Sequence, residues 1–168
     1  KTNYFTNNIA SQGGCIYTEI GSNMLTSQNT FTRNTAREYG GLFKINSRDF
    51  IISNNQIDYN TAIHGSVLYY SEILCIDNCS INKSIFTDNH VRHNSASMDG
   101  TIYMHKKSKL RSINNIYSYN IGKKGAIYYI NTDGELNIYN ETGVGNQGDF
   151  GSIVYYQGRK ITLTHSIY

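Results

Sequence analysis

The sequence predicts an all-β protein folded as a parallel β-helix of about six coils, each roughly 26 residues long. Three observations lead to this fold class. The strand formers Ile, Tyr and Thr and the turn formers Asn and Gly are abundant, whereas Ala, Leu and Glu are scarce. Two motifs recur with nearly one period along all 168 residues. No segment has the 3.6-residue periodicity of a helix, and we expect the usual right-handed coil.

The first motif is an apolar residue followed three positions later by Asn. Successive motif asparagines are separated by 26, 26, 29, 31 and 26 residues. Stacked coils place equivalent residues above one another, so carboxamide groups can bond each other and the backbone along the axis. The spacing therefore predicts a structural Asn ladder made of Asn8, Asn34, Asn60, Asn89, Asn120 and Asn146.

The second motif follows each Asn and consists of Gly, an aliphatic residue and an aromatic residue. Gly permits the positive φ that a coil corner needs. Strict alternation along a strand would point the aromatic rings outward, as a binding stripe for a sugar or another protein. A bulge that reverses the alternation would bury them, and the sequence leaves both arrangements open. The aromatic positions are Tyr17, Phe43, Tyr69, Tyr103, Tyr128 and Tyr155.

A third short apolar patch in each repeat, such as Phe50 with Ile52, predicts three strands per coil. Residues 1–168 then form one domain, a segment of a longer solenoid, because the sequence begins and ends inside a repeat without a polar cap. Open solenoid ends expose core and unpaired strand edges. We therefore expect neighbouring repeats or another copy of the chain to pair with them.

One coil is predicted to be irregular. Eight extra residues between Asn60 and Asn120 indicate a bulged coil over 70–99, with three of them before Phe86 and about five between Asn89 and Gly100. His90 and His93 lie in the second bulge, at 90–93. No Cys or acidic residue is spaced to complete a metal site with them, so we expect no metal and no other cofactor.

Cysteines and sequons carry weaker signals. Cys75 and Cys79 flank the first bulge and are spaced for a local disulfide, whereas Cys15 lies in an apolar motif and is expected to be a free buried thiol. N-glycosylation is expected at the sequons if the protein passes through a eukaryotic secretory route. The sequon asparagines are Asn78, Asn82 and Asn140.

The net charge of +3 is small and dispersed, which argues against a nucleic-acid partner. One basic cluster, 106–111, is interpreted as a solvated loop. No stretch of 18 apolar residues exists, so no membrane span is expected in this segment.

The pairing of Phe-x-x-Asn with Gly-Gly-aliphatic resembles the repeat of chlamydial polymorphic outer-membrane proteins and of related β-helix surface proteins, including large repeat proteins of protists. The best copies pair 5–8 with 13–16 and 31–34 with 40–43. The resemblance extends over nearly the whole chain, but Gly-Gly becomes Asp99-Gly100, Lys124-Gly125 and Phe150-Gly151. It implies a passenger or ectodomain β-helix used for adhesion at the cell surface, without catalysis.

We therefore expect an extracellular or cell-surface protein that is structural or adhesive, including assembly end to end into a filament, and not an enzyme. Its partners would be other copies or neighbouring repeats, glycans or a cell-surface receptor. Two alternatives stay open: a carbohydrate-binding β-helix, and an enzyme resembling a polysaccharide lyase or hydrolase, which needs clustered acids. The best constellation for catalysis is His64, Asp99 and Lys124, which could form an acid–base site or a charge-complementary ladder.

Overall fold

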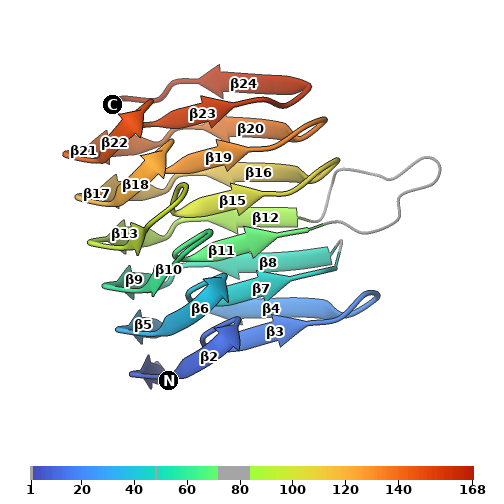
Figure 1. Ribbon diagram of the computed structural model, residues 1–168, viewed down its shortest axis with the longest axis vertical. Helices are drawn as coiled ribbons and strands as arrows, with labels where there is room; N and C mark the ends of the chain where they lie inside the picture. Colours follow the sequence, from blue (N-terminus) through green and yellow to red (C-terminus); the bar gives the residue numbers. More distant parts are fainter. Residues whose placement is uncertain (1, 48, 72–83) are drawn as a thin grey trace.

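The computed structural model describes residues 2–47, 49–71 and 84–168, which form a single rod of stacked coils (Figure 1). All strand pairs in these ranges are parallel and join residues of successive coils. Four six-stranded sheets run along the rod, and the described residues contain no helix. The predicted parallel β-helix of about six coils is confirmed.

Each coil contributes one strand to each of four sheets, which we name A to D in chain order. Sheet A consists of β1 (Tyr4–Thr6), β5 (Thr30–Thr32), β9 (Gln56–Asp58), β13 (His90–Arg92), β17 (Ile116–Ser118) and β21 (Thr142–Val144). Sheet B consists of β2 (Ile9–Gln12), β6 (Thr35–Tyr39), β10 (Thr61–Ala62), β14 (Ser95–Ala96), β18 (Ile121–Lys124) and β22 (Gln147–Phe150). Sheet C consists of β3 (Ile16–Thr18), β7 (Phe43–Ile45), β11 (Leu68–Tyr70), β15 (Ile102–Met104), β19 (Tyr128–Ile130) and β23 (Val154–Tyr156). Sheet D consists of β4 (Asn23–Ser27), β8 (Asp49–Ser53), β12 (Ser84–Thr87), β16 (Lys109–Ile113), β20 (Glu135–Tyr139) and β24 (Lys160–Thr164).

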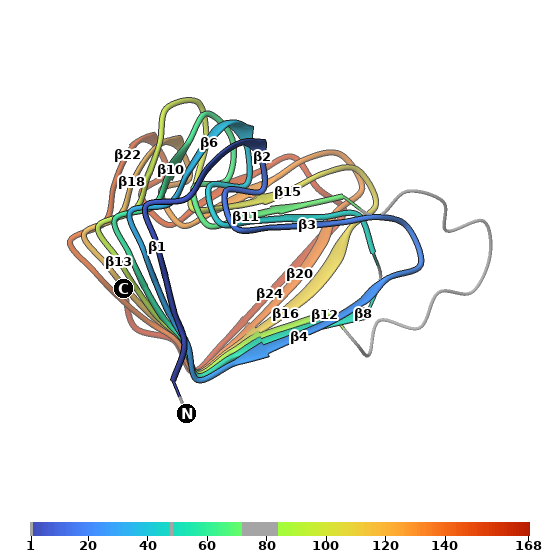
Figure 2. The same cartoon turned by 90° about the horizontal axis from the view of Figure 1, so that it is seen from below.

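The sequence predicted three strands per coil, and the structure has four because sheet B lies between the Asn and Gly motifs. Seen along the rod, sheets A, C and D surround the interior, and sheet B lies at the corner between A and C (Figure 2). Sheet B carries no apolar run that would reveal it. One column of paired residues in it holds only Ala and Gly, from Ala10 through Ala36, Ala62 and Ala96 to Gly122 and Gly148.

The interior is filled by columns of apolar side chains from sheets A, C and D. Alternation along each strand sends every second residue inward, so one column collects equivalent residues of successive coils. In sheet A, the Phe5 and Phe31 rings stack with centroids 4.8 Å apart. Fully burying one large apolar side chain stabilises the fold by about 1.5–3 kcal/mol. The buried cluster includes Phe31, Phe43, Phe50, Ile57, Leu68, Phe86, Val91, Ile102, Leu110, Tyr117, Tyr128 and Ile138.

Two corners of each coil share one local structure, in which a residue with φ between 50° and 64° is followed by a polar side chain, usually Asn. This left-handed conformation costs a non-glycine residue about 1–2 kcal/mol, so the packing around it must hold it in place. Between sheets A and B the left-handed residues are Asn7, Arg33, Tyr59, His93, Tyr119 and Gly145. Between sheets D and A they are Gln28, Asn54, Asp88, Asn114, Asn140 and His165.

The Asn after the A–B corner forms a ladder along the rod. The backbone N–H and the Nδ2 of each Asn both donate to the Oδ1 of the Asn one coil further on, at 2.8–3.1 Å. The placement of Asn89 in this ladder was wrong. Val91, not Phe86, pairs with Ile57 in sheet A, so Asn94 takes that place. The ladder runs through Asn8, Asn34, Asn60, Asn94, Asn120 and Asn146.

Asn89 belongs to a second ladder, which follows the D–A corner. Its Oδ1 accepts from the backbone N–H and Nδ2 of Asn55 at 3.0 and 3.1 Å, and it donates in turn to Asn115. The residues three positions earlier are Thr26, Ile52, Phe86 and Ser112, so the apolar-x-x-Asn motif is degenerate here. The members are Asn3, Asn29, Asn55, Asn89, Asn115, Glu141 and, in the last place, Ser166, whose hydroxyl oxygen accepts from the Glu141 N–H.

With Asn94 in the first ladder, the steps become 26, 26, 34, 26 and 26 residues, which indicates one insertion. It lies between sheets C and D of the third coil. Tyr70 and Phe86 are 16 residues apart, while their partners in the coil above, Met104 and Ser112, are eight apart. The second bulge predicted within 89–100 is therefore wrong. Cys75, Cys79, Asn78 and Asn82 lie outside the described residues.

Replacing Asn60 by Ala is expected to destabilise the fold by roughly 2–4 kcal/mol. Asn60 is fully buried, and its loss leaves the backbone N–H and Nδ2 of Asn34 without their acceptor. Chemical denaturation measures the change. The matched control is Asn23→Ala at an exposed strand position, expected within about 0.5 kcal/mol of the parent protein. Equal effects of the two substitutions would contradict the role of the ladder.

Candidate functional site

The outer face of sheet C gathers the aromatic residues and is the candidate site. The expected stripe mixes two columns. Tyr17, Tyr69, Tyr103 and Tyr155 do lie in one register, but Lys44 and Tyr129 complete it. Phe43 and Tyr128 belong to the neighbouring inward column, with Ile16, Leu68, Ile102 and Val154, and both are fully buried.

The error arose from aligning the repeats on the aromatic residue. The Gly with positive φ at the corner between sheets B and C gives the correct register. In most coils the third residue after this Gly faces inward and the fourth faces outward. Gly40 precedes Phe43 by three positions, and Gly125 precedes Tyr128 by three. Phe43 and Tyr128 are therefore inward residues that happen to be aromatic. Counting from Gly would have identified Lys44 and Tyr129.

The outward tyrosines stack on one another along the rod. The centroid distances are 4.6 Å for Tyr69–Tyr103, 4.8 Å for Tyr103–Tyr129 and 5.3 Å for Tyr129–Tyr155, with ring planes within 7° of parallel. Below them, the ammonium of Lys44 lies 4.0 Å from the centroid of Tyr69. Both ring faces of Tyr69, Tyr103 and Tyr129 are thus occupied by neighbouring rings or by the cation, and these tyrosines offer a partner only ring edges and hydroxyl groups.

A second set of side chains covers this column. Tyr39 packs edge-on against Tyr69 at 4.7 Å, and His64 packs against Tyr103 at 5.7 Å. Tyr69 and Tyr103 are consequently only 8% and 9% exposed. Burial lowers the pKa of Lys44 to about 8, and its Nζ donates to the Oδ1 of Asn46 at 2.9 Å. The centre of the tyrosine column is therefore part of the packed structure.

Amide side chains hold the tyrosine hydroxyl groups from the following coil. Asn46 Nδ2 donates to the Tyr17 hydroxyl at 3.1 Å, and Asn131 Nδ2 donates to that of Tyr103 at 3.0 Å. The Tyr129 hydroxyl donates to Gln157 Oε1 at 3.1 Å. Most of the polar groups on this face are thus already used in contacts between coils.

The structure brings together two members of the predicted acid–base constellation. His64 Nδ1 lies 2.6 Å from Asp99 Oδ2, and the N–H of Gly65 donates to Asp99 Oδ1 at 2.8 Å. Burial raises the pKa of the Asp99 carboxyl, although the hydrogen bonds from His64 and Gly65 act in the opposite direction. Lys124 exerts an electrostatic effect on Asp99 and lies 5.3 Å from the centroid of the Tyr155 ring.

The contact with Asp99 fixes the orientation of the His64 imidazole. An oriented imidazole is one part of a general acid–base site. The His64 ring also stacks on Tyr39 at 5.3 Å, and its side chain is 30% exposed. Among the described residues, no three His, Cys, Asp or Glu side chains lie close enough to hold a metal ion. His90 lies in sheet A, where it pairs with Ile116 of the next coil. His93 lies at the A–B corner, where its ring stacks on those of Tyr59 and Tyr119.

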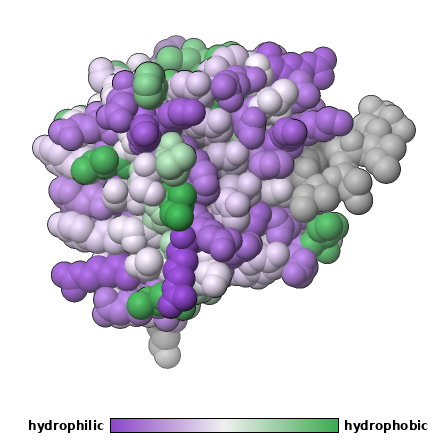
Figure 3. All heavy atoms as spheres, viewed as in Figure 1, coloured by the Kyte–Doolittle hydropathy of each residue, from purple (hydrophilic) through white to green (hydrophobic). Residues whose placement is uncertain are grey.

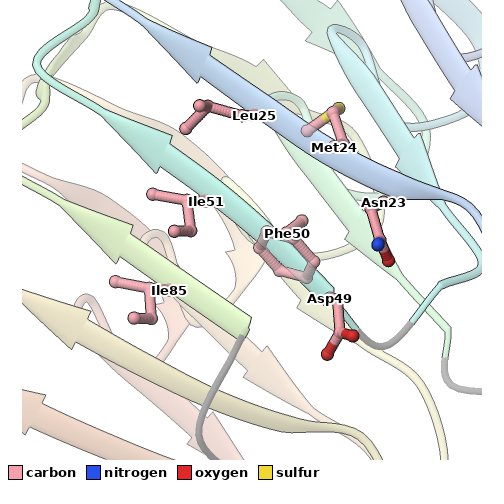
Figure 4. A pocket seen from close by; sticks show the side chains of 7 residues that line it. All are labelled: Asn23, Met24, Leu25, Asp49, Phe50, Ile51 and Ile85. Carbon is pink, nitrogen blue, oxygen red and sulfur yellow. The ribbon is translucent and has the colours of Figure 1, made fainter.

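A pocket of about 320 Å³ opens on the outer face of sheet D (Figure 4). Leu25, Ile51 and Ile85 come from three neighbouring strands and point to the same side, and Asn23 and Asp49 lie at one end. Leu25 is 72% exposed. This apolar strip is hard to recognise in the sequence because Phe50 and Ile52, the inward residues of the same strand, dominate the apolar pattern.

A buried acid inside the solenoid was also missed. Glu141 takes the place of Asn in the second ladder and is 1% exposed. Its carboxylate accepts hydrogen bonds from Asn115 Nδ2 at 2.9 Å, from the Tyr128 hydroxyl at 2.7 Å, from the Tyr168 hydroxyl at 3.0 Å and from the Ser112 hydroxyl. Burial nevertheless raises the pKa of Glu141. Its position directly after the left-handed Asn140 is the signal that identifies it as a ladder residue.

Two residues with predicted chemistry remain. Asn140, the one sequon asparagine that the structure describes, is exposed at a corner, where its Nδ2 donates to Asn114 Oδ1 at 2.8 Å. Cys15 is a free thiol that is half-buried, and burial raises its pKa to about 11. Asn8 Nδ2 lies 3.6 Å from its sulfur. A thiol with this pKa is largely protonated at neutral pH and therefore a poor nucleophile.

Comparison with protein-family models, with curated protein sequences and with solved structures finds no match for this chain. The class of protein that the structure defines is a parallel β-solenoid built from repeats. The resemblance to the chlamydial and protist surface proteins is supported at this level of architecture. No helix among the described residues is long and apolar enough to cross a membrane.

Replacing Glu141 by Gln is expected to raise the melting temperature at pH 7 and to change it little at pH 4. A carboxyl whose pKa is raised by folding destabilises the fold as the pH rises from its ordinary value through its folded value. Gln keeps an acceptor oxygen for Tyr128 and removes the buried charge. Thermal melts at the two pH values measure this, with exposed Glu19→Gln as the control. A lower melting temperature for Glu141→Gln at pH 7 would show that the ionised carboxylate is stabilising.

Proposed function

We propose that this chain is an extracellular or cell-surface structural protein, a rigid rod that serves in adhesion or as a spacer. The observation that carries the proposal is the use of polar and aromatic side chains in contacts between coils. Two Asn ladders and the tyrosine column run along the rod. A chain whose repeated chemistry is used to hold coils together is suited to rigidity and length.

Assembly into a filament is a further part of this proposal. Strands β1 to β4 and β21 to β24 lie at the edges of the four sheets. Edge strands present unpaired N–H and C=O groups that pair readily with another strand. Stacking of coils at about 4.8 Å would continue the existing ladders without a new kind of contact.

Electron microscopy of native material, with light scattering on the same sample, tests the filament. Uniform fibres with an axial subunit repeat are expected. Dispersed monomers at the same concentration would remove the filament from the proposal. Labelling intact, unpermeabilised cells with an antibody against the rod tests location separately, and labelling only after permeabilisation would contradict a surface protein.

A second candidate function is carbohydrate chemistry, which the oriented His64–Asp99 pair favours. The stacked rings offer a sugar few free faces, so a binding role would use hydroxyl and amide groups at the column's edge. Incubating the protein with uronate and neutral polysaccharides, and repeating the assay with His64→Ala, distinguishes the candidates. Cleavage that His64→Ala abolishes would favour the enzyme over the rod.

Expression through a eukaryotic secretory route is expected to place an N-glycan on Asn140. The residue is exposed, and Thr142 completes its sequon. Glycopeptide mass spectrometry measures occupancy. Thr142→Ser should retain the glycan and Thr142→Ala should lose it. An unmodified Asn140 in secreted parent protein would contradict the prediction.

A further inference from the structure

The corner between sheets C and D carries a cluster of cations in the last three coils. In the first of these coils, Lys106, Lys107, Lys109 and Arg111 lie between β15 and the middle of β16. Two coils further on, Arg159 and Lys160 occupy the same corner. Strand register places Lys109, Glu135 and Lys160 in one column and Arg111, Asn137 and Thr162 in another. We call 105–111, 131–137 and 157–162 the basic corner.

The net charge of the basic corner is larger than the net charge of the entire chain. It contains six of the 15 basic and two of the 12 acidic side chains, a balance of +4. The remainder of the chain has nine basic and ten acidic side chains. The small net charge of +3 therefore conceals a strongly asymmetric distribution. An electrostatic surface of this kind attracts anionic partners and raises their rate of association.

The geometry leaves most of these cations free for a partner. Lys106, Lys107, Arg159 and Lys160 are exposed, and Arg159 is 74% exposed at its side chain. Glu135 lies between two of the cations, 3.7 Å from Lys109 Nζ and 4.0 Å from Arg159 Nη1. Neither distance makes a tight pair. In Figure 3, the right-hand edge of the upper coils, above the grey atoms, is hydrophilic.

Neutral polar groups flank the cations on the same corner. His105, Asn131 and Gln157 directly follow successive strands of sheet C, and Thr132 and Asn137 lie on the same corner. A partner that matches this surface carries anionic groups and hydroxyl groups at short intervals along an extended chain. Acidic polysaccharides have this chemistry.

We propose that the basic corner binds a sulfated or carboxylated linear polysaccharide. The inference deepens the adhesive function proposed above and rests on it for its biological meaning. The binding itself is a property of the purified protein, so its failure and the failure of surface location are measured independently. The cations bind the sulfate or carboxylate groups, and the Asn137 amide, which lies between Arg111 and Thr162 in the same column, binds hydroxyl groups. Duplex nucleic acid is the other polyanion that such a surface could attract, and the test separates the two.

The experiment measures binding of a size-defined heparin-derived oligosaccharide to the parent protein by calorimetry, at physiological ionic strength and at low salt. Binding that weakens with added salt is expected, because contacts between exposed charges are screened. The triple variant Lys106→Gln, Lys107→Gln and Arg159→Gln should weaken it by about tenfold or more, because each exposed cation contributes to the attraction of an anionic partner. Absence of binding by the parent protein at physiological ionic strength would overturn the proposal.

Two further variants make the test specific to the corner. Arg33→Gln, Arg37→Gln and Lys123→Gln remove the same charge from exposed positions elsewhere and should change affinity by less than about twofold. Asp133→Asn should tighten binding, because Asp133 is exposed in the corner at φ 61° and Asn tolerates that conformation. Equal losses in both triple variants would show that net charge alone governs binding.

The nature of the partner is tested with a desulfated oligosaccharide of the same length and with a DNA duplex of similar charge. The desulfated chain should bind at least about tenfold more weakly, because it lacks most of the anionic groups. DNA that binds as tightly as the sulfated glycan, with the same loss in the corner variant, would overturn the assignment to a polysaccharide.

Discussion

The structure depends on the corner at which a left-handed residue is followed by an Asn whose carboxamide oxygen accepts two N–H groups from the preceding coil. The left-handed residue turns the chain, and the Asn links that turn to the same turn in the next coil. Each corner is unfavourable by itself because it strains a non-glycine residue. The hydrogen bonds between coils offset that cost, so the corner is stable only within a stack.

This constraint explains where the repeat tolerates change. Two of the corners in each coil are bound to their neighbours, mostly through Asn. The spacing between successive corners is 26 residues in four of five steps at the A–B corner and in three of five at the D–A corner, where the last step is 25. The eight-residue insertion lies in neither of them. It falls between sheets C and D, one of the two corners where the described residues form no Asn ladder. The basic corner lies on the same side of the solenoid in the later coils, so loop variation and charge concentrate together.

The sequence predicted the fold class, the number of coils and the existence of an Asn ladder, because these depend on periodicity alone. The sequence-based prediction failed where two segments fit the same motif equally well. Phe86-x-x-Asn89 fits the motif as well as Val91-x-x-Asn94, and only strand pairing decides between them. Sheet B was missed because its Ala and Gly columns lack an apolar pattern. Glu141 could be placed only once the second ladder was known.

The site was less predictable than the fold because it depends on register to one residue. A shift of one position reverses the side of the sheet on which a residue lies. Phe43 and Tyr128 were therefore placed in one column with the outward tyrosines, a column that Lys44 and Tyr129 complete. Stacking distances of 4.6–5.3 Å follow from coil spacing, and they leave ring edges outward. A tyrosine stack on a solenoid thus stabilises the coils before it serves any partner.

Native-state hydrogen exchange of the ladder amides tests the central claim most directly. The backbone N–H groups of Asn34, Asn60 and Asn94 donate to side-chain oxygens of the next coil, although they lie at corners of the chain. Strong protection is therefore predicted, comparable to that of amides in the middle of sheets A and C. Exchange as fast as in an exposed loop would contradict the account, because the corners would then not be joined by the Asn ladders.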